Sequence, residues 1–420
     1  MTATLAAPLD AASARPAHRD GNVLRWLAAY TSSMVGDSVY YIALSWAAVQ
    51  AGSPSQAGLV MSVSALPRAV LMLGGGVIAD RLGPRRVVIA SDAVRCAAVL
   101  AVAALLFLGS PGLWPLAALA FVFGTVDAVF MPAVGALPAR VTSRDQLARV
   151  QGMRGLAIRF ASVVGGPLGG LGVAVGGAAA AFGLAGLLIA VSVPLLVSVR
   201  MTGLPADDND KAGAQDRGTA WNDLVSGLHY IRRHRVLAPL MLAIALGDLG
   251  FVGPLNVGLT LLADERGWGA SGMGAVLAGF GVGAGAAALL LTVRGRLPHA
   301  GQVAAYAILA GSVAIGALAY VPTLVAAVGT ALLVGLLAGL SGAMCGALLQ
   351  THADPAFLGR VTAVAGLVSL GFAPLSMPLS AAAIGAWGTG PVFVVSAAVC
   401  GLGGVVALLV RDLRRAELPE

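Results

Sequence analysis

Long apolar runs recur along the whole chain, and they limit its possible folds more than any other feature of the sequence. Each run holds about 20 residues with few charges, which is the length of helix that crosses the roughly 30 Å hydrocarbon core of a bilayer. The runs do not alternate with period two, so the strands of a membrane β-barrel are disfavoured. With 58% hydrophobic and only 11% charged residues, the chain also lacks the surface of a soluble domain. The pattern predicts an all-α polytopic membrane protein.

Twelve of these runs are predicted to span the membrane, six in each half of the chain. The first six cover Val23–Gln50, Gln56–Ala79, Val87–Leu108, Leu113–Leu137, Gln151–Val173 and Gly177–Val199. The second six cover Val236–Leu262, Ala270–Val293, Val303–Val321, Leu324–Leu349, Val361–Ala386 and Val392–Val410. The expected domains are a tail at 1–22, a bundle at 23–200, a linker at 201–235, a second bundle at 236–410 and a tail at 411–420.

An internal repeat relates the two halves. One offset of 211 residues (247 − 36) aligns Gly36-Asp37 with Gly247-Asp248, Gly135-Ala136-Leu137 with Gly346-Ala347-Leu348, Arg149-Val150 with Arg360-Val361, and Pro167-Leu168 with Pro378-Leu379. A single dipeptide match could arise by chance in so biased a composition. Because one constant offset joins four separated anchors, we expect two pseudo-symmetric six-helix bundles.

Basic residues gather in alternate connections, and this sets the expected orientation because cytoplasmic loops retain Lys and Arg. Of the 26 basic residues, Arg68, Arg95 and Arg159 fall within predicted spans and Arg266 lies on the opposite side, which leaves 26 − 4 = 22 on one face. Both termini are therefore expected in the cytoplasm, with the chain in the plasma or inner membrane. The net charge of +7 then faces anionic lipid head groups and does not indicate nucleic acid.

The linker contains a segment with the pattern of an amphipathic helix. Its apolar positions recur at helical spacing, at Trp221, Leu224, Val225, Leu228 and Ile231. The opposite side holds Arg232 and Arg233. This distribution is typical of a helix that lies in the membrane interface.

Several classes of protein are disfavoured by what the sequence lacks. A phosphate-binding Walker loop needs a Gly-Lys pair, and the only lysine, Lys211, follows Asp210. The three cysteines are far apart, without the spacing of a metal site or a disulfide framework. No nucleophile, base or metal cluster converges on one helix face. We therefore expect neither an ATP-driven pump nor an enzyme, and no cofactor or metal.

Four ionisable residues are predicted to lie deep in the membrane. Asp37, Asp127 and Asp248 each fall roughly 18 to 20 Å from the nearest inner basic residue, at about 1.5 Å per helical residue. Arg68 reaches the same depth on the second span. Charged groups at this depth are expensive and mark function or a specific partner.

Two interpretations of these residues stay open. In the first, Asp37 or Asp127 exchanges a proton during transport; in the second, each acid is permanently paired or packs two helices together. Arg68 and Arg159 either pair with an acid or bind an anionic group of a solute, and Arg159 has the further alternative of snorkelling to the membrane surface. The five histidines fall in tails or connections, so carboxylates would have to carry any proton coupling.

The short connection between the second and third spans carries a specific motif. It reads "GVIADRLGPRR" and supplies Gly76, Asp80, Arg81, Gly83, Arg85 and Arg86. "SDAVRC" follows it, with Asp92 and Arg95. The pair of motifs resembles the signature loop of the major facilitator superfamily and the acid and arginine that its efflux branches carry at the entrance to the third span.

The resemblance implies a charge network that locks the cytoplasmic side when the transporter faces outward, assigned here to Asp80, Arg81, Arg85, Asp92 and Arg95. In the fifth span, "GGPLGG" resembles the Gly-Pro motif of proton-driven antiporters and supplies Gly166, Pro167 and Gly170. Ser162 and Met153 stand where that motif has glycine, so this part of the resemblance is weaker.

From the family resemblance we expect a monomeric secondary active transporter with alternating access. Its partners would be protons and an amphipathic small organic compound, namely a drug, siderophore or natural product, exported by proton antiport. The substrate site would lie at the midplane between the halves. Two alternatives remain, which are proton-coupled or facilitated uptake of a small metabolite and a membrane scaffold or sensor that does not transport.

Overall fold

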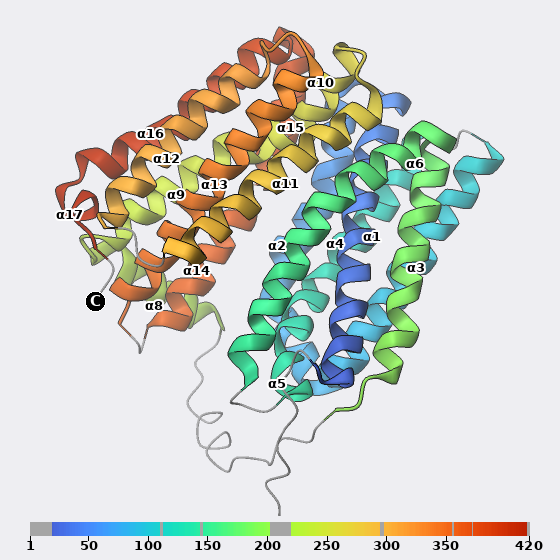
Figure 1. The fold of residues 1–420 in the computed structure, drawn as a ribbon, viewed down its shortest axis with the longest axis horizontal. Helices are drawn as coiled ribbons and strands as arrows, with labels where there is room; N and C mark the ends of the chain where they lie inside the picture. Colours follow the sequence, from blue (N-terminus) through green and yellow to red (C-terminus); the bar gives the residue numbers. More distant parts are fainter. Residues whose placement is uncertain are drawn as a thin grey trace, which may run out of the picture.

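The chain folds into two helical bundles, one from each half of the sequence (Figure 1). The computed structural model describes residues 19–109, 112–142, 146–201, 220–294, 298–354, 357–371 and 373–417. Within these ranges all regular structure is helical, as the absence of period-two alternation in the sequence predicts. In Figure 1 the first bundle runs from blue to green and the second from yellow-green to red.

The first bundle contains α1 (Gly21–Ala51), α2 (Pro54–Leu82), α3 (Pro84–Leu108), α4 (Leu113–Ala136), the short α5 (Pro138–Val141) and α6 (Leu147–Ser198). The 52-residue α6 is interrupted by non-helical backbone at Gly176 and Gly177, where Gly177 has φ +68°. That positive φ favours glycine because other residues lose energy in the left-handed region. The break falls between the two spans predicted for this segment, so α6 is two helices in sequence.

The second bundle follows the linker helix α8 (Ala220–Arg233). Its helices are α9 (Leu237–Gly253), η3 (Pro254–Gly258), α10 (Leu259–Glu265), α11 (Gly269–Arg294), α12 (Ala300–Leu318), α13 (Leu324–His352), α14 (Leu358–Gly371), α15 (Ala373–Trp387), α16 (Thr389–Leu409) and α17 (Arg411–Arg414). Because α9, η3 and α10 follow one another without a break, they form one rod with a wide π-helical turn at its centre.

Eight helical stretches among the described residues are long and apolar enough to cross a membrane. They are Pro84–Leu108, Leu113–Ala136, Arg149–Ser198, Leu237–Glu265, Gly269–Leu291, Ala300–Leu318, Leu324–His352 and Thr389–Leu409. The 50-residue stretch Arg149–Ser198 contains two of the predicted spans. The charge-bearing α1 and α2 are 31 and 29 residues long but lie outside this set. The total of twelve spans stays a prediction.

Glycines allow the helices within each bundle to approach closely. A Cβ added at Gly124 of α4 would overlap the carbonyl oxygen of Ser64 on α2. In the second bundle, Gly283 of α11 meets the backbone of α13 at Leu332 in the same way. Helices in lipid associate through such close packing, since no hydrophobic effect drives apolar faces together there. Close packing of this kind accounts for glycine at these positions.

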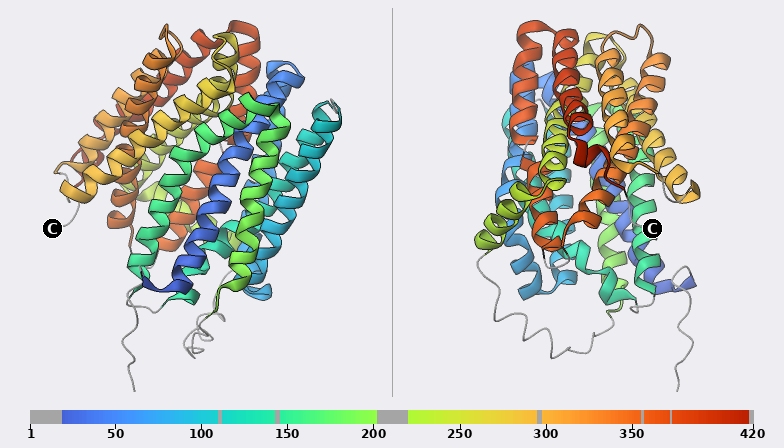
Figure 2. Two further views of the ribbon diagram at one scale, coloured as in Figure 1. Left: turned by 45° about the vertical axis from the view of Figure 1, so that its right-hand side comes forward. Right: turned by 90° about the vertical axis from the view of Figure 1, so that its left-hand side faces the viewer.

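Most of the contact between the two bundles comes from two helix pairs, α2 with α15 and α6 with α11. At one end, the side-chain nitrogen of Gln50 donates to Asp264 Oδ1 across the bundles at 2.9 Å. Figures 1 and 2 show the bundles meeting at this end, near α10, and diverging toward the end that carries α5 and α8. The contact between the halves is therefore concentrated toward the end opposite the linker helix.

Replacing Gly124 with alanine should destabilise the first bundle, because the added methyl group cannot fit against the backbone at Ser64. Overpacking of this kind costs about 1–3 kcal/mol. Thermal unfolding of the detergent-purified protein should therefore shift to lower temperature. Gly135→Ala is the matched control, since this position on α4 has no atom within 4 Å of the new Cβ. Equal melting temperatures for the two variants would contradict the packing assignment.

Candidate functional site

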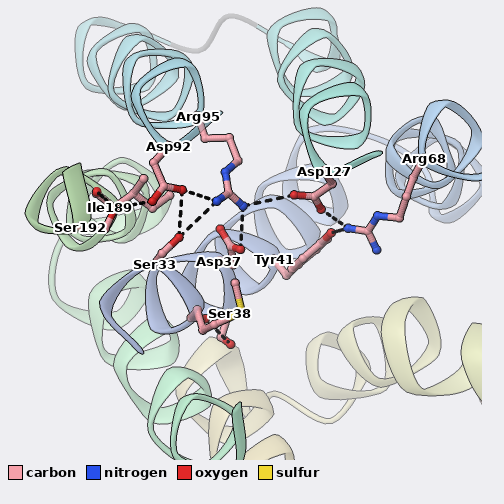
Figure 3. Close-up of polar contacts among 11 residues, drawn as sticks. Ser33, Asp37, Ser38, Tyr41, Arg68, Asp92, Arg95, Asp127, Ile189 and Ser192 are labelled. Carbon is pink, nitrogen blue, oxygen red and sulfur yellow. Dashed lines mark hydrogen bonds and ion pairs between the residues drawn. The ribbon is translucent and has the colours of Figure 1, made fainter. Parts of the chain in front are cut away.

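A buried polar cluster connects the helices of the first bundle (Figure 3). Its side chains come from α1, α2, α3, α4 and the second part of α6: Ser33, Asp37, Tyr41, Arg68, Asp92, Arg95, Asp127 and Ser192. The polar groups pair with one another, as buried polar groups must in order to offset the loss of water.

Arg95 of α3 lies at the centre of this cluster and is fully buried. Its Nη1 donates to Asp37 Oδ2 at 2.8 Å and to Asp127 Oδ1 at 3.1 Å. Its Nη2 donates to Asp92 Oδ1 and, at 3.2 Å, to Ser33 Oγ. One guanidinium thus contacts three carboxylates on three helices.

Two aromatic rings of α4 complete the surroundings of this guanidinium. The Arg95 Cζ atom lies 4.0 Å from the ring centroid of Phe130 and 5.5 Å from that of Phe123. Cations are attracted to the faces of aromatic rings, and more strongly where water is absent. The two rings therefore keep water away from the Arg95 guanidinium and also compensate part of its positive charge.

Arg68 of α2 is the second cation of the cluster. It donates to Asp127 Oδ2 and to the hydroxyl of Tyr41. Because Asp127 uses its other oxygen for Arg95, it bridges the two guanidinium groups. The pairing of Arg68 with an acid at its own depth is one of the alternatives that the sequence leaves open.

The two other acids differ in how many hydrogen bonds their carboxylate oxygens accept. Asp92 accepts hydrogen bonds from Ser33 and Ser192 in addition to Arg95. Asp37 uses Oδ2 for Arg95, while its Oδ1 is buried without a hydrogen-bond partner. The side chain of Asp37 is 13% exposed, against 4% for Asp127 and 1% for Asp92. Asp37 is therefore the most accessible acid of the cluster.

The charges of the cluster do not balance. Three carboxylates, on Asp37, Asp92 and Asp127, face two guanidinium groups, on Arg68 and Arg95. With all five groups ionised the net charge is 2 − 3 = −1, and one added proton brings it to zero. The arrangement can therefore take up and release a single proton without leaving a cation unpaired.

Sequence reasoning missed three members of the cluster. Ser33 and Tyr41 lie four residues before and after Asp37, and side chains at this spacing share one helix face. This spacing could have predicted that both residues lie beside Asp37. No sequence pattern predicts Ser192, because it contacts Asp92 from a helix 100 residues away in sequence.

The residues predicted to form a cytoplasmic charge lock are divided by the structure. Asp92 and Arg95 belong to the buried cluster. Arg85 donates to the carbonyl oxygen of Val197, and Arg81 is exposed with no ion-pair partner among the described residues. Two other residues of the loop motif are described: Gly83 forms the turn before α3 with φ +84°, and Arg86 is exposed. The side chain of Asp80 and the surroundings of Gly76 lie outside the described residues. The lock itself stays a prediction.

A cavity of about 530 Å³ lies among helices of the second bundle, and Arg159 of the first bundle reaches it. Most of its lining comes from the second bundle and is apolar, with the rings of Phe251 and Phe280. Asp248 of α9 faces the cavity and accepts a hydrogen bond from Ser369. Arg159 of α6 lines it from the first bundle and has no hydrogen-bond or ion-pair partner in the described part of the chain. The cavity thus offers one carboxylate group and one guanidinium group in apolar surroundings.

The fifth-span motif lies where the halves meet. A Cβ added at Gly166 would lie 2.7 Å from the carbonyl oxygen of Gly274, and one at Gly170 would lie 2.6 Å from that of Ala270. Pro167 lies between them inside α6. Glycine at these positions therefore lets α6 contact the backbone of α11.

The described residues contain no group of three His, Cys, Asp or Glu side chains that could hold a metal ion. The carboxylates of the cluster instead contact arginines. The chemistry that this arrangement supports is proton exchange and binding of a polar or ionised group.

Comparison with known proteins agrees with this architecture. A family model described as the Major Facilitator Superfamily matches residues 26–373. The enterobactin exporter EntS of Shigella boydii is 26% identical over 370 residues, which cover 86% of this chain and 84% of the exporter. The multidrug efflux pump Tap of Mycolicibacterium fortuitum is 26% identical over 429 residues, which cover 95% of this chain and 98% of the pump.

Solved structures share the fold at lower sequence identity. The crystal structure of a mutant of the nucleoside transporter NupG superposes with a TM-score of 0.73. The match covers 93% of this chain and 100% of that one. Because the sequence identity is only 11%, the match shows a shared fold and nothing about function.

Replacing Arg95 with glutamine should strongly destabilise the protein, because three buried carboxylates lose their shared cation. Breaking a buried ion pair from one side costs about 3–5 kcal/mol. Adding Asp92→Asn to Arg95→Gln should restore part of this loss, a coupling that a double-mutant cycle of melting temperatures measures. Arg81→Gln, at an exposed position, should melt like the parent protein. An Arg95→Gln variant as stable as the parent would refute the central role of Arg95.

Proposed function

This chain belongs to the major facilitator superfamily, and we propose that it exports an amphipathic small organic compound by proton antiport. Its family and relatives make it a multi-pass membrane transporter and not an enzyme. The proposal adds direction, coupling ion and type of cargo to that assignment. Each of the three has its own support.

Export is favoured by the two relatives, one named as an exporter of enterobactin and the other as a multidrug efflux pump. Both matches extend over most of this chain, including both bundles. They favour export of a drug, siderophore or natural product over the uptake of a metabolite. The charge cluster and the cavity favour a transporter over a scaffold, since a scaffold needs neither.

Proton coupling is supported by one observation above all, the excess of one carboxylate over the guanidinium groups of the buried cluster. Asp37 is the acid best placed to receive the proton, because its Oδ1 is unpaired and its side chain is the most exposed of the three. Protonation of Asp37 weakens its bond to Arg95, which retains Asp92 and Asp127 as partners. The first bundle would then rearrange with each proton bound or released.

The cavity lined by the second bundle and Arg159 supports an amphipathic cargo. Its apolar and aromatic lining fits the hydrocarbon part of a small organic molecule, while a few convergent polar groups fix the orientation of such a ligand. Arg159 and Asp248 are those groups here. The guanidinium of Arg159 suits an anionic group of the cargo, and Asp248 a hydrogen-bond donor or a cation.

Alternating access would occur by movement of the two bundles about this cavity. Gly166 and Gly170 bring α6 and α11 into contact. Because glycine has no side chain, the two helices could slide past each other at these positions. In the orientation expected from the basic residues, both termini and α8 face the cytoplasm. We take the monomer as the transporting unit, since the described residues of a single chain supply both the charge cluster and the cavity.

Replacing Asp37 with asparagine should abolish proton coupling, because the amide keeps the shape of the side chain but cannot bind the exchanged proton. The measurement uses proteoliposomes with an imposed pH gradient and a panel of fluorescent amphipathic compounds, with cargo accumulation and internal pH followed together. Accumulation by Asp37→Asn should fall to the level of liposomes without protein, while exchange of cargo without a gradient persists. Asp412→Asn, at an exposed position of α17, is the matched control. Gradient-driven accumulation by Asp37→Asn equal to that of the parent would sink the proposal.

Replacing Arg159 with glutamine should weaken binding of anionic compounds selectively. A hydrogen bond to a charged group contributes about 1.5–3 kcal/mol, so the dissociation constant should rise about tenfold or more. Neutral analogues of the same compounds should bind as before, and Arg159→Lys should recover part of the loss. Arg149→Gln, an exposed position on the same helix, controls for general charge. Equal losses for anionic and neutral compounds would show that Arg159 has no role in recognising charge.

A further inference from the structure

A second pocket of about 400 Å³ lies beside the linker helix α8. It is lined by Ser226, His229, Tyr230, Arg233, His234 and Phe357. None of these residues lines the cavity that contains Asp248. We call it the α8 pocket; it is separate from the proposed transport path.

The walls of the α8 pocket are held in place by contacts between α8 and the start of α14. The ring of Tyr230 stacks on that of Phe357, with centroids 4.5 Å apart and planes 5° from parallel. The hydroxyl of Tyr230 accepts a hydrogen bond from the backbone N–H of Asp354 at 3.1 Å. The guanidinium of Arg360 covers Phe357, 5.2 Å from its ring centroid. The pocket is therefore preformed.

Basic side chains line one side of this pocket. His229 and Arg233 lie four residues apart on α8, so their side chains share one helix face. Neither has a hydrogen-bond or ion-pair partner among the described residues. Among the described residues that line the pocket there is no acid. The described lining is therefore basic, polar and aromatic.

His234 adds a hydrogen-bond donor whose direction is set by the fold. Its Nδ1 accepts from the backbone N–H groups of Val236 and Leu237, at 3.3 and 3.2 Å. A ring nitrogen that accepts carries no hydrogen, so the hydrogen of the neutral imidazole is on Nε2. Burial, together with the neighbouring His352, lowers the pKa of His234, which favours the neutral ring. Nε2–H is then free to donate to a ligand.

Two apolar residues of α8 are sequence neighbours of residues that line the pocket. Val225 and Leu228 of α8 are each half-exposed, although both are large and hydrophobic. A soluble anion would use the cations alone and leave this apolar surface in water. A molecule with an anionic head and a hydrocarbon tail uses both, and an amphipathic helix with basic residues binds such a surface.

We propose that the α8 pocket binds the headgroup phosphate of an anionic phospholipid. Arg233 and His229 contact the phosphate, His234 donates to it from Nε2, and Val225 and Leu228 pack against the acyl chains. Lipid binding here would anchor α8 against α14 and so tie the linker between the two bundles to the bilayer surface. This inference does not depend on the direction or coupling of transport.

The test measures how many phosphatidylglycerol molecules the full-length protein retains, by native mass spectrometry in detergent across a lipid titration. Arg233→Gln should lower the affinity for phosphatidylglycerol about fivefold, the factor expected for one basic residue near an anionic surface. Arg232→Gln is the matched control, because it removes the same charge from the same helix but does not line the pocket. Arg233→Lys should keep most of the affinity, and phosphatidylcholine should bind weakly to all variants.

A second variant, His229→Gln, provides an independent test, because it replaces another side chain that lines the pocket and leaves Arg233 in place. His229→Gln should also bind phosphatidylglycerol more weakly than the parent. This variant keeps the test valid if gel filtration shows that Arg233→Gln is poorly folded. Unchanged retention in the pocket variants would overturn the proposal, and so would equal losses for Arg232→Gln and Arg233→Gln. Displacement of the lipid by an equal concentration of inorganic phosphate would overturn it as well, since the pocket would then be a site for free anions.

Discussion

The burial of one guanidinium determines how the first bundle is assembled. Arg95 is fully buried in a bundle whose surroundings are lipid, where an unpaired charge is very costly. That cost is offset only if α1, α3 and α4 bring their carboxylates to the same point, and Asp92 extends the requirement to α6 through Ser192. The cluster is therefore a structural tie between helices and also the place where one negative charge is left over.

The two halves share a fold but not this cluster. The offset of 211 residues relates Asp37 to Asp248, yet the positions that correspond to Arg95 and Asp127 hold Tyr306 (95 + 211) and Ala338 (127 + 211). Without a cation beside it, Asp248 faces the cavity and is bound by Ser369 alone. The proposed division of labour follows from this difference, with proton exchange in the first half and cargo contacts mainly in the second.

Close packing at glycine serves both stability and movement in this chain. Within a bundle, positions such as Gly124 press one helix against the backbone of another and resist change. Between the bundles, Gly166 and Gly170 bring the backbones of α6 and α11 close together. Contacts made by backbone and small residues can be broken and re-formed with little repacking, which suits an interface that must open in every cycle.

The sequence by itself determined the helical class, the repeat and the position of most helices; for example, the span expected at Leu113–Leu137 is observed as Leu113–Ala136. These properties depend on the length and hydropathy of each segment, which are local. The number of spans and the charge lock stay predictions. Only the tertiary structure placed Arg95 with Asp37 and Asp127, separated Asp248 from them and brought in Ser192. Such partners depend on how each helix is rotated about its axis and which helix lies beside it, and neither is encoded in the apolar pattern of a single span.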